Sequence, residues 1–419
     1  MKRRKRRRKL KVDRIILALL FLIFICLVSI YLIKGENKAN KNLKEVPKQE
    51  QKKEVKEEEK TYKVSVIAAG DNLIHQSIYK DAQTSYNEYD FTPMYELIKP
   101  IVKEYDIAYY NQETILGGKD LGVSDYPTFN SPQEVGDAMI DAGFNLVSLA
   151  TNHTMDSGEQ AVLKSREYWD TKENVLAVGS YSSFEDKEKI RIMEKNNISY
   201  TMLNYTYGTN GIAVPKGKEY LVNVWPTDLE INDPEKDTKY QEYKKEVKKD
   251  IDKVRDKVDV LIVAMHWGVE YTHEPTAYEK DMAEYLANEG VDVIIGTHPH
   301  VIQPVTWIDN TLVIYSLGNF ISAQYQNQGS CLNYMCTTGL MTSFEIEKTT
   351  KGKKSSIKIQ NINNELIYTY YSGWRNFKVI PFSNSKIKDT LYTYKNTYEK
   401  YKNVVTKYDE TIKVKACYE

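Results

Sequence analysis

The sequence predicts an α/β fold, and three observations support this prediction. Short β-branched runs alternate with segments of helical pattern from residue 61 to about residue 295, the order that builds a parallel sheet with covering helices. Further strand-like runs then follow one another, which indicates a second, mixed or antiparallel sheet. Several runs end in a carboxylate, amide or imidazole, as is typical of a binding site at the carboxyl edge of a sheet.

The expected elements follow the chain in that alternating order. Strands are predicted where short apolar, β-branched or aromatic runs occur, and helices where apolar residues recur every three to four positions. The expected strands cover residues 62–69, 106–110, 145–150, 175–178, 190–194, 199–205, 258–265, 291–295, 301–308, 312–316, 340–347 and 356–369. The expected helices cover residues 93–104, 132–142, 159–173, 238–257 and 276–289.

The N-terminus has a different composition. Residues 1–14 hold ten basic and one acidic side chain, and residues 15–33 form an uncharged apolar run that is long enough to cross a hydrocarbon core of ~30 Å. The alternative is a cleaved signal peptide, but the run is long for one and no small-x-small site follows it. We therefore expect a transmembrane helix, with the basic segment cytoplasmic and the main domain extracellular in a single-pass protein of the cell membrane.

The remaining chain divides by composition. Residues 34–60 hold nine basic and seven acidic side chains and almost no apolar ones, which predicts a disordered charged linker. Residues 61–384 are the expected main domain, and residues 385–419 a helical or irregular C-terminal extension. Of the 58 basic and 58 acidic residues, 39 and 50 remain in residues 61–419. This net charge of −11 argues against a nucleic-acid partner, and an anionic substrate would need a local cation such as a metal ion.

The four cysteines leave two alternatives open. Cys26 lies in the apolar run, Cys331 and Cys336 lie close together in a polar loop, and Cys417 is near the C-terminus. In an extracellular domain Cys331 and Cys336 can form a disulfide, and free thiols are the alternative. No CxxC or thiolate metal pattern is present.

Two histidines follow the run at residues 291–295. Gly296 permits a sharp turn where the strand ends. Pro299 biases His298 away from the helical region, so residues 298–300 are predicted to be extended. In an extended segment residues i and i+2 point the same way, and His298 and His300 are therefore expected to form half of a metal site.

Other strand ends supply candidates for the second half. The candidates are Asp71, His75, Asn111, Glu113, Asn152, His153, Asp156, His266, Trp267 and Glu270. Each of them alone can be a surface, capping or core residue. Five of the six histidines nevertheless occupy these strand ends, and His273 lies just after one. Independent accidents would not produce that placement, so we predict a metal or catalytic centre.

The donor types indicate the chemistry. Imidazole suits zinc, iron and manganese, and carboxylate and amide oxygens suit manganese or magnesium. We expect a divalent metal, as two ions of Mn, Zn or Fe bridged by Glu113 or Asp71, and hydrolysis of a phosphoester or an amide. There is no G-x-S-x-G elbow and no Walker loop, so a serine hydrolase or an NTPase finds no support.

Six motifs in order resemble the capsule-biosynthesis CapA family, also called the poly-γ-glutamate synthesis family. They are Gly70-Asp71-Asn72, Asn111-Gln112-Glu113, Asn152-His153-x-x-Asp156-x-Gly158, His266-Trp267-Gly268-x-Glu270-Tyr271, Gly296-x-His298-Pro299-His300-Val301-x-Gln303 and Tyr315-Ser316-Leu317-Gly318-Asn319-Phe320. The resemblance covers residues from about 63 to 325. It implies a calcineurin-like metallophosphatase-type sandwich of two mixed β-sheets flanked by helices.

The resemblance also implies residue roles. The implied metal ligands are Asp71, His75, Glu113, Asn152, His266, His298 and His300. The implied catalytic residues are His153, Asp156 and Glu270, and the implied substrate-binding residues are Asn111, Trp267, Gln303 and Asn319. Phosphatases of this type usually have Asp-x-His in the first motif and an aspartate as the bridging ligand. Here His75 stands four residues after Asp71, and Glu113 replaces that aspartate, so one metal position is altered.

Three functions are consistent with these features. The first is an anchored, metal-dependent hydrolase or transferase-like enzyme acting in synthesis or export of an anionic capsule polymer such as poly-γ-glutamate. The second is a non-catalytic polymer-binding scaffold for a membrane synthase. The third is a phosphoesterase unrelated to capsule. The membrane, the polymer and membrane synthase subunits are the partners that the resemblance implies.

Overall fold

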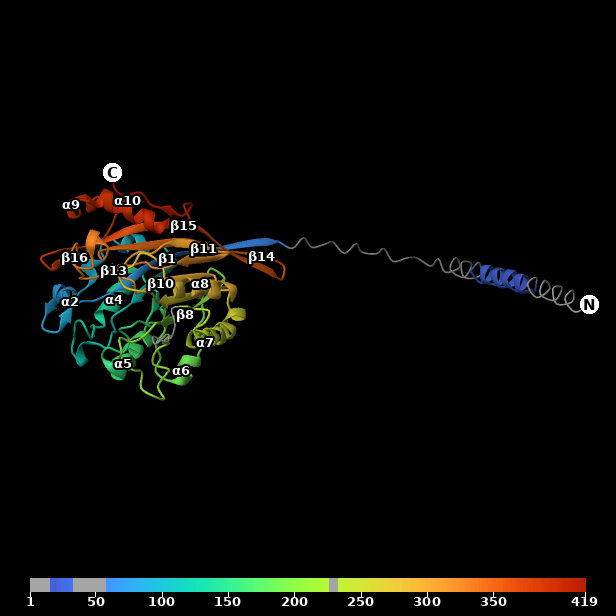
Figure 1. The fold of residues 1–419 in the computed structure, drawn as a ribbon, viewed down its shortest axis with the longest axis horizontal. Coiled ribbons are helices and arrows are strands. Elements are labelled where there is room, and N and C mark those ends of the chain that lie inside the picture. Colours follow the sequence, from blue (N-terminus) through green and yellow to red (C-terminus); the bar gives the residue numbers. More distant parts are fainter. Residues whose placement is uncertain (1–15, 33–57, 226–232) are drawn as a thin grey trace, which may run out of the picture. The chain divides into compact units, whose positions relative to one another are not determined.

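The computed structural model describes residues 16–32, 58–225 and 233–419, which fall into two compact units, Met1–Glu57 and Glu58–Glu419 (Figure 1). In the first unit, residues 16–32 form a helix whose side chains are exposed. No helix within the three described ranges is both long enough and apolar enough to cross a membrane. The ends of the predicted span, the basic segment 1–14 and residues 34–57 of the predicted linker lie outside the described residues.

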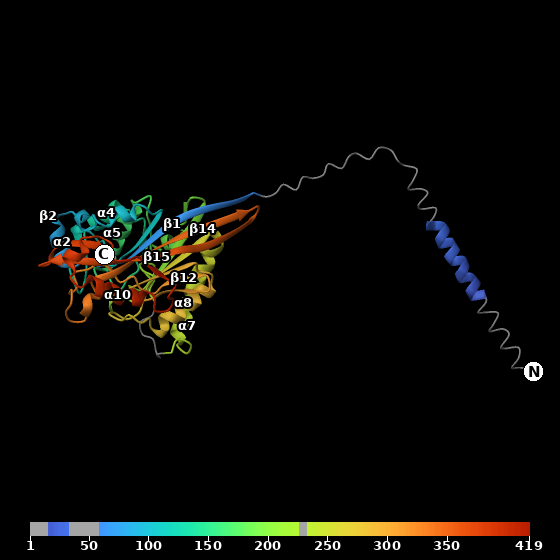
Figure 2. The same ribbon diagram turned by 90° about the horizontal axis from the view of Figure 1, so that it is seen from above.

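The larger unit contains two mixed sheets (Figures 1 and 2). The first sheet has the order β16 (Arg375–Pro381), β15 (Lys354–Ser372), β14 (Thr338–Lys351), β1 (Glu59–Asn72), β4 (Ile107–Gln112), β5 (Leu146–Ser148) and β6 (Leu176–Val178). From β1 to β6 neighbouring strands are parallel, and from β1 to β16 they are antiparallel. β13 (Asn319–Ile321) pairs with the end of β1, and β17 (Lys413–Val414) pairs with β15.

The second sheet has a parallel centre and antiparallel edges. Its order is β11 (Val305–Ile308), β12 (Thr311–Ile314), β10 (Val293–Thr297), β9 (Val260–His266), β8 (Ile198–Thr206) and β7 (Met193–Lys195). β12, β10, β9 and β8 are parallel, and both edge strands pair antiparallel. A separate hairpin joins β2 (Gln83–Ser85) and β3 (Glu88–Tyr89).

The two sheets pack face to face because their strands alternate. In β1, Val64 and Val66 join one buried cluster with Ile262 and Ile295 of the second sheet, whereas Ile67 faces a cluster of helical residues. α2 (Gln76–Ala82), α3 (Lys99–Val102), α4 (Glu134–Ala142) and α5 (Gly158–Asp170) cover the outer face of the first sheet, and α7 (Thr238–Val254) and α8 (Ala277–Asn288) cover that of the second (Figure 1). The predicted sandwich of two mixed sheets with flanking helices is confirmed at this level.

The shorter elements complete the unit. α6 (Phe184–Glu188) precedes β7, and the predicted C-terminal extension contains α9 (Ile387–Thr390), α10 (Tyr394–Val405) and β17. Buried side chains of α10, such as Tyr401, join the cluster between the sheets. The extension therefore belongs to the same core as the main domain.

Local predictions were wrong at residues 93–104, at Gly296 and at the end of the predicted linker, where residues 59 and 60 already belong to β1. The helix expected at residues 93–104 is a 3-10 turn, Thr92–Met94, followed by the single turn of α3, because a continuous helix would place Pro100 in its interior. The turn expected at Gly296 is also absent, since β10 continues through this residue. A Cβ atom here would lie 1.8 Å from the Tyr315 carbonyl oxygen, so Gly296 serves close strand packing.

Candidate metal centre

The ends of four strands bring the candidate ligands together. Asp71 lies at the end of β1 opposite Asn111 of β4, and Glu113 follows β4. His266 ends β9 opposite Thr297 of β10. Because each pair of strands is parallel, their carboxyl ends meet at one edge. Asp71, Glu113 and His266 are buried there, as are the histidines that follow β10.

The first group of potential ligands is Asp71, Glu113 and His300. One ligand atom of each lies within 4.8 Å of the others. His300 Nδ1 is 3.4 Å from Asp71 Oδ2, and His300 Nε2 is 3.6 Å from Glu113 Oε1. Burial lowers the pKa of His300, but the Glu113 and Asp71 carboxylates outweigh burial and raise that pKa to about 10.

Glu113 is the most unusual residue of this group. Both carboxylate oxygens are buried without a hydrogen-bond partner. Burial raises the pKa of Glu113 well above its ordinary value. A buried carboxylate without partners is costly to the fold, and a bound cation would satisfy it. The donor set therefore fits a divalent metal ion.

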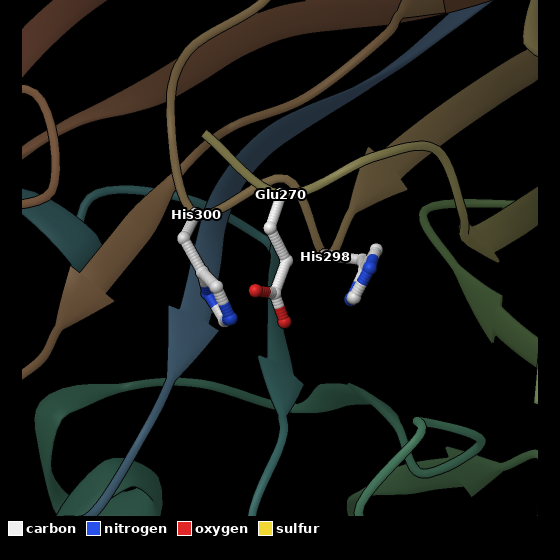
Figure 3. Close-up of side chains that lie close together, drawn as sticks. All are labelled: Glu270, His298 and His300. Carbon is white, nitrogen blue, oxygen red and sulfur yellow. The ribbon is translucent and has the colours of Figure 1, made fainter. Parts of the chain in front are cut away.

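The second group is Glu270, His298 and His300. Their ligand atoms also lie within 4.8 Å of one another, and Figure 3 shows the Glu270 carboxylate between the two imidazoles. His298 Nδ1 is buried and unpartnered. Burial, with a smaller contribution from His300, lowers the pKa of His298 well below its ordinary value, which favours the neutral form that binds metals.

The backbone around the two histidines differs from the prediction. Residues 298–300 are not extended, because φ is 96° at His298 and 57° at His300. The chain turns after β10, and the His298 N–H donates to Asp71 Oδ2 at 3.2 Å. The two rings still face the same site, with centroids 5.8 Å apart. The expected pairing of the imidazoles thus arises from a turn rather than from strand alternation.

Asn152 and His266 lie at the site but bond to each other. Asn152 Oδ1 is 2.8 Å from His266 Nε2, and His266 Nδ1 is 3.0 Å from Thr297 Oγ1. His266 Nε2 is also 4.0 Å from Glu113 Oε1. Burial lowers the pKa of His266 well below its ordinary value. To bind an ion, this pair would have to exchange its mutual hydrogen bond for the metal.

His153 and Asp156 form a buried dyad. His153 Nδ1 lies 2.6 Å from Asp156 Oδ2, which also accepts the Phe129 N–H at 2.8 Å. The side chain of Asn210 reaches both His153 Nδ1, at 3.1 Å, and the Asn152 amide, at 3.0 Å. Asn210 was not among the predicted residues, because its loop carries no recognisable motif.

His75 lies beside the candidate metal centre. Its Nδ1 is 3.3 Å from both the Leu73 carbonyl and the Ala323 N–H, and its ring packs edge-on against Phe129. Burial lowers its pKa to about 4. Within the described residues His75 belongs to neither group of converging ligand atoms. The structure does not bring this predicted ligand together with the others.

The residues expected to bind substrate have other contacts. Asn111 donates to Asp71 Oδ1 at 2.9 Å, and Asn319 Oδ1 is 3.0 Å from His300 Nδ1. The Trp267 indole is fully buried and donates to the Tyr315 carbonyl at 3.0 Å. Gln303 is fully buried and donates to the Thr272 carbonyl at 3.0 Å. Trp267 and Gln303 are thus buried and bonded to backbone carbonyls, whereas the two asparagines contact Asp71 and His300.

One aromatic neighbour was missed. The Tyr207 ring centroid lies 4.4 Å from that of His298. Tyr207 follows β8, whose end shows no charged or imidazole side chain. A polar aromatic residue directly after a predicted central strand is the signal that would have found it.

The fold and the site define an α/β protein with a buried carboxylate–imidazole centre at the shared edge of two sheets. Residues 65–324 match the model of a family described as bacterial capsule synthesis protein PGA_cap. This match covers more than half of the chain, so the chain belongs to that family, as the motifs predict.

Two relatives and one solved structure show how far the similarity extends. The chain is 27% identical over 333 residues to the PGA biosynthesis protein CapA of Bacillus subtilis (strain 168), covering 75% of this chain and 82% of that protein. It is 27% identical over 203 residues to the capsule biosynthesis protein CapA of Bacillus anthracis, covering 46% of this chain and 44% of that one. A hypothetical protein from Thermus thermophilus is similar in structure with a TM-score of 0.39 and 15% identity, over 71% of this chain and 98% of that one.

Proposed function

We propose that this protein binds a divalent metal ion and acts in the synthesis or export of an anionic capsule polymer, poly-γ-glutamate, as a metal-dependent hydrolase. Membership of the capsule synthesis family and the names of its Bacillus relatives support the polymer. The observation that carries the metal is the buried Glu113 carboxylate, which has no hydrogen-bond partner in the described residues and lies 3.6 Å from His300. The calcineurin-like metallophosphatase type of the fold is part of this proposal.

Asp71, Glu113 and His300 would hold the ion, and the ligand atoms of Glu270 and His298 converge on the same His300. When bound, Mn, Zn or Fe supplies Lewis acidity that polarises an ester or amide oxygen and lowers the pKa of water. Glu270 is exposed, whereas the other four are buried, so Glu270 marks the solvent side of the site. The two groups of ligand atoms share His300, and a second ion remains part of the proposal.

The His153–Asp156 dyad is suited to proton transfer. With its Nδ1 2.6 Å from the Asp156 carboxylate, the ring donates that N–H to Asp156, and a proton taken up at Nε2 would pass from the imidazolium to the leaving group. The neighbouring Phe129 ring meets the imidazole edge-on at 4.8 Å and restricts its rotation. Asp156 is then a positioning residue and His153 the acid.

We further propose that residues 15–33 anchor the protein in the cell membrane, with the main domain outside and the residues from 34 to the start of β1 at Glu59 as the linker. The apolar run and the basic residues before it support this orientation. The disulfide between Cys331 and Cys336 suits an oxidising compartment. A membrane synthase subunit is the proposed partner in such an arrangement.

Metal binding and turnover test the enzymatic part. The purified full-length chain would be loaded with Mn, Zn or Fe, and hydrolysis of a phosphodiester and of a γ-glutamyl oligomer measured with and without chelator. We expect bound metal and chelator-sensitive turnover, both lost in Asp71→Ala. Absence of metal and of turnover with all three ions would overturn the proposal.

The second candidate is a non-catalytic polymer-binding subunit. The burial of Asp71, Glu113 and His298 favours it, because a buried ion is less accessible to a long substrate. In cells, polymer production that survives Asp71→Ala would support this alternative, whereas loss of polymer would support the hydrolase.

A further inference from the structure

An uncharged cavity has none of the candidate metal ligands in its lining. It has a volume of about 530 Å³ and lies between the loop after β13 and the tip of the β15–β16 hairpin. Three aromatic and three amide side chains account for most of its lining, namely Tyr325, Tyr371, Trp374, Gln326, Asn327 and Gln328. None of its lining residues is charged, although 28% of the chain is Asp, Glu, Lys or Arg.

The aromatic residues form a platform. The Tyr371 and Trp374 rings stack with centroids 4.8 Å apart and planes 19° apart, and Tyr325 meets Trp374 edge-on at 5.7 Å. Tyr325 is 53% exposed and Trp374 is 42% exposed. Large rings that cluster at the surface mark interaction sites more often than isolated exposed rings do.

The backbone holds Trp374 in a conformation that is rare for a bulky residue. Gly373 and Trp374 form the two-residue turn between β15 and β16, with φ of 56° and 59°. Such turns favour glycine and asparagine, and a large side chain at positive φ is an outlier. Strain of this kind persists where the surrounding structure and a function maintain it. Here it keeps the indole at the mouth of the cavity.

The loop after β13, which a disulfide closes, contributes amide groups to the lining of the cavity. Gln328 has no side-chain hydrogen bond to any described residue, and Asn327 uses only its oxygen, which accepts the Asn333 N–H at 2.7 Å. The Cys331–Cys336 disulfide closes the same loop. The Gln328 amide and the Asn327 NH2 group are therefore free to bind a ligand.

We propose that this cavity is a binding site for an uncharged pyranose unit of a glycan. The C–H face of a sugar ring matches the partly exposed rings of Trp374 and Tyr325, and sugar hydroxyls match the amide groups of Asn327 and Gln328. A polyanion such as poly-γ-glutamate does not fit, because no Lys or Arg lines the cavity. The site would hold the protein on a cell-wall glycan or on a neutral capsular glycan.

Calorimetric titration of the purified full-length chain tests the site. The probes are tetra-N-acetylchitotetraose, which represents the acetamido sugars of cell walls, and cellotetraose, which represents plain hexose chains. We expect saturable binding of at least one probe, and the preferred probe distinguishes the two sources. A γ-glutamyl oligomer should neither bind at this cavity nor compete with the sugar.

Matched variants assign the binding to the cavity. Trp374→Ala and Tyr325→Ala should each weaken binding about tenfold or more, whereas Trp374→Phe should retain most of it. Tyr86→Ala, which removes a tyrosine that is 94% exposed elsewhere, should bind as the parent does. Asp71→Ala should also bind normally, which separates this site from the metal centre.

Three results would overturn the proposal. They are absence of binding by both oligosaccharides, unchanged affinity in Tyr325→Ala and Trp374→Ala, and displacement of the sugar by the γ-glutamyl oligomer. Thermal unfolding by circular dichroism identifies any variant that fails to fold. If Trp374→Ala does fail, Tyr325→Ala decides the outcome.

Discussion

Asn319 fixes the imidazole of His300, with its Oδ1 3.0 Å from His300 Nδ1. The Asn319 amide is itself held by the Gln324 side chain at 2.6 Å and the Cys336 carbonyl at 2.7 Å. His300 belongs to both groups of converging ligand atoms. Asn319, which the sequence suggested as a substrate contact, therefore orients the ligand that the two groups share.

Asn319→Ala should weaken metal binding. Without the amide oxygen, His300 loses the partner that sets its ring orientation and tautomer, and loss of such a partner typically lowers metal affinity about 10- to 100-fold. Titration of the metal-free protein with Mn or Zn measures the effect. Asn288→Ala, which changes an exposed asparagine of α8, serves as control, and equal affinity in both variants would contradict the role of Asn319.

Glu113→Gln should stabilise the metal-free protein and abolish stabilisation by metal. The substitution removes a buried carboxylate whose oxygens have no hydrogen-bond partner in the described residues, and an unsatisfied buried group costs about 1–3 kcal/mol. Thermal unfolding with and without metal measures both effects. Glu270→Gln is the control, because Glu270 is exposed and its neutralisation should not stabilise the metal-free protein. A lower unfolding temperature for metal-free Glu113→Gln would contradict this view.

Asp156→Asn should lower turnover and leave metal content unchanged. The amide no longer accepts the His153 N–H as a carboxylate does, and general acid catalysis contributes about 100-fold or more to rate. The measurements are kcat with a phosphodiester substrate and the amount of bound metal. Glu167→Gln, on the exposed face of α5, should behave as the parent. Loss of metal in Asp156→Asn would instead place this residue in the ion site.

Removing the Cys331–Cys336 disulfide should destabilise both the candidate metal centre and the cavity that Tyr325 and Trp374 line. A Cys331→Ser/Cys336→Ser variant opens a loop with a sequence separation of 5, which costs about 2 kcal/mol in unfolding free energy. It also weakens the support that the Cys336 carbonyl gives Asn319, so metal affinity should fall, though less than in Asn319→Ala. Cys417→Ser, which changes a free cysteine, should alter neither stability nor affinity.

Glu279 should make stability depend on pH. Burial raises its pKa to about 7 from an ordinary 4.5, even though Thr276 donates hydrogen bonds to it. The folded protein holds the Glu279 proton more tightly than the unfolded chain does. The contribution of this proton to the free energy of unfolding is therefore full below pH 4.5 and is lost as pH rises to about 7. The free energy of unfolding then falls by at most about 1.4 kcal/mol per pH unit.

Denaturant unfolding between about pH 4.5 and pH 8 tests this dependence. Glu279→Gln keeps an oxygen for the helix cap and should remove the slope, whereas Glu284→Gln, on the exposed side of α8, should retain it. A slope that persists in Glu279→Gln would show that another group titrates.

Much of the site could be predicted because strand periodicity is local. The pattern of apolar residues predicted β1, β4, β9 and β10. The polar residues at or after the ends of these strands include Asp71, Glu113, His266, His298 and His300, which were the predicted ligands. Parallel strands bring their carboxyl ends to one edge, so the convergence of these residues follows from the order of elements. Family membership followed from the same motifs.

Tertiary structure alone decided which atoms meet. The turn at His298 and His300, the bond between Asn152 and His266, and the support of His300 by Asn319 depend on backbone conformations after the strands and on the packing of two sheets. The stack of Tyr371 on Trp374 beside Tyr325 joins segments about fifty residues apart. Side-chain type and spacing specify a strand and its faces, but hydrogen-bond distances across elements are set by register and by turns, which no local pattern encodes.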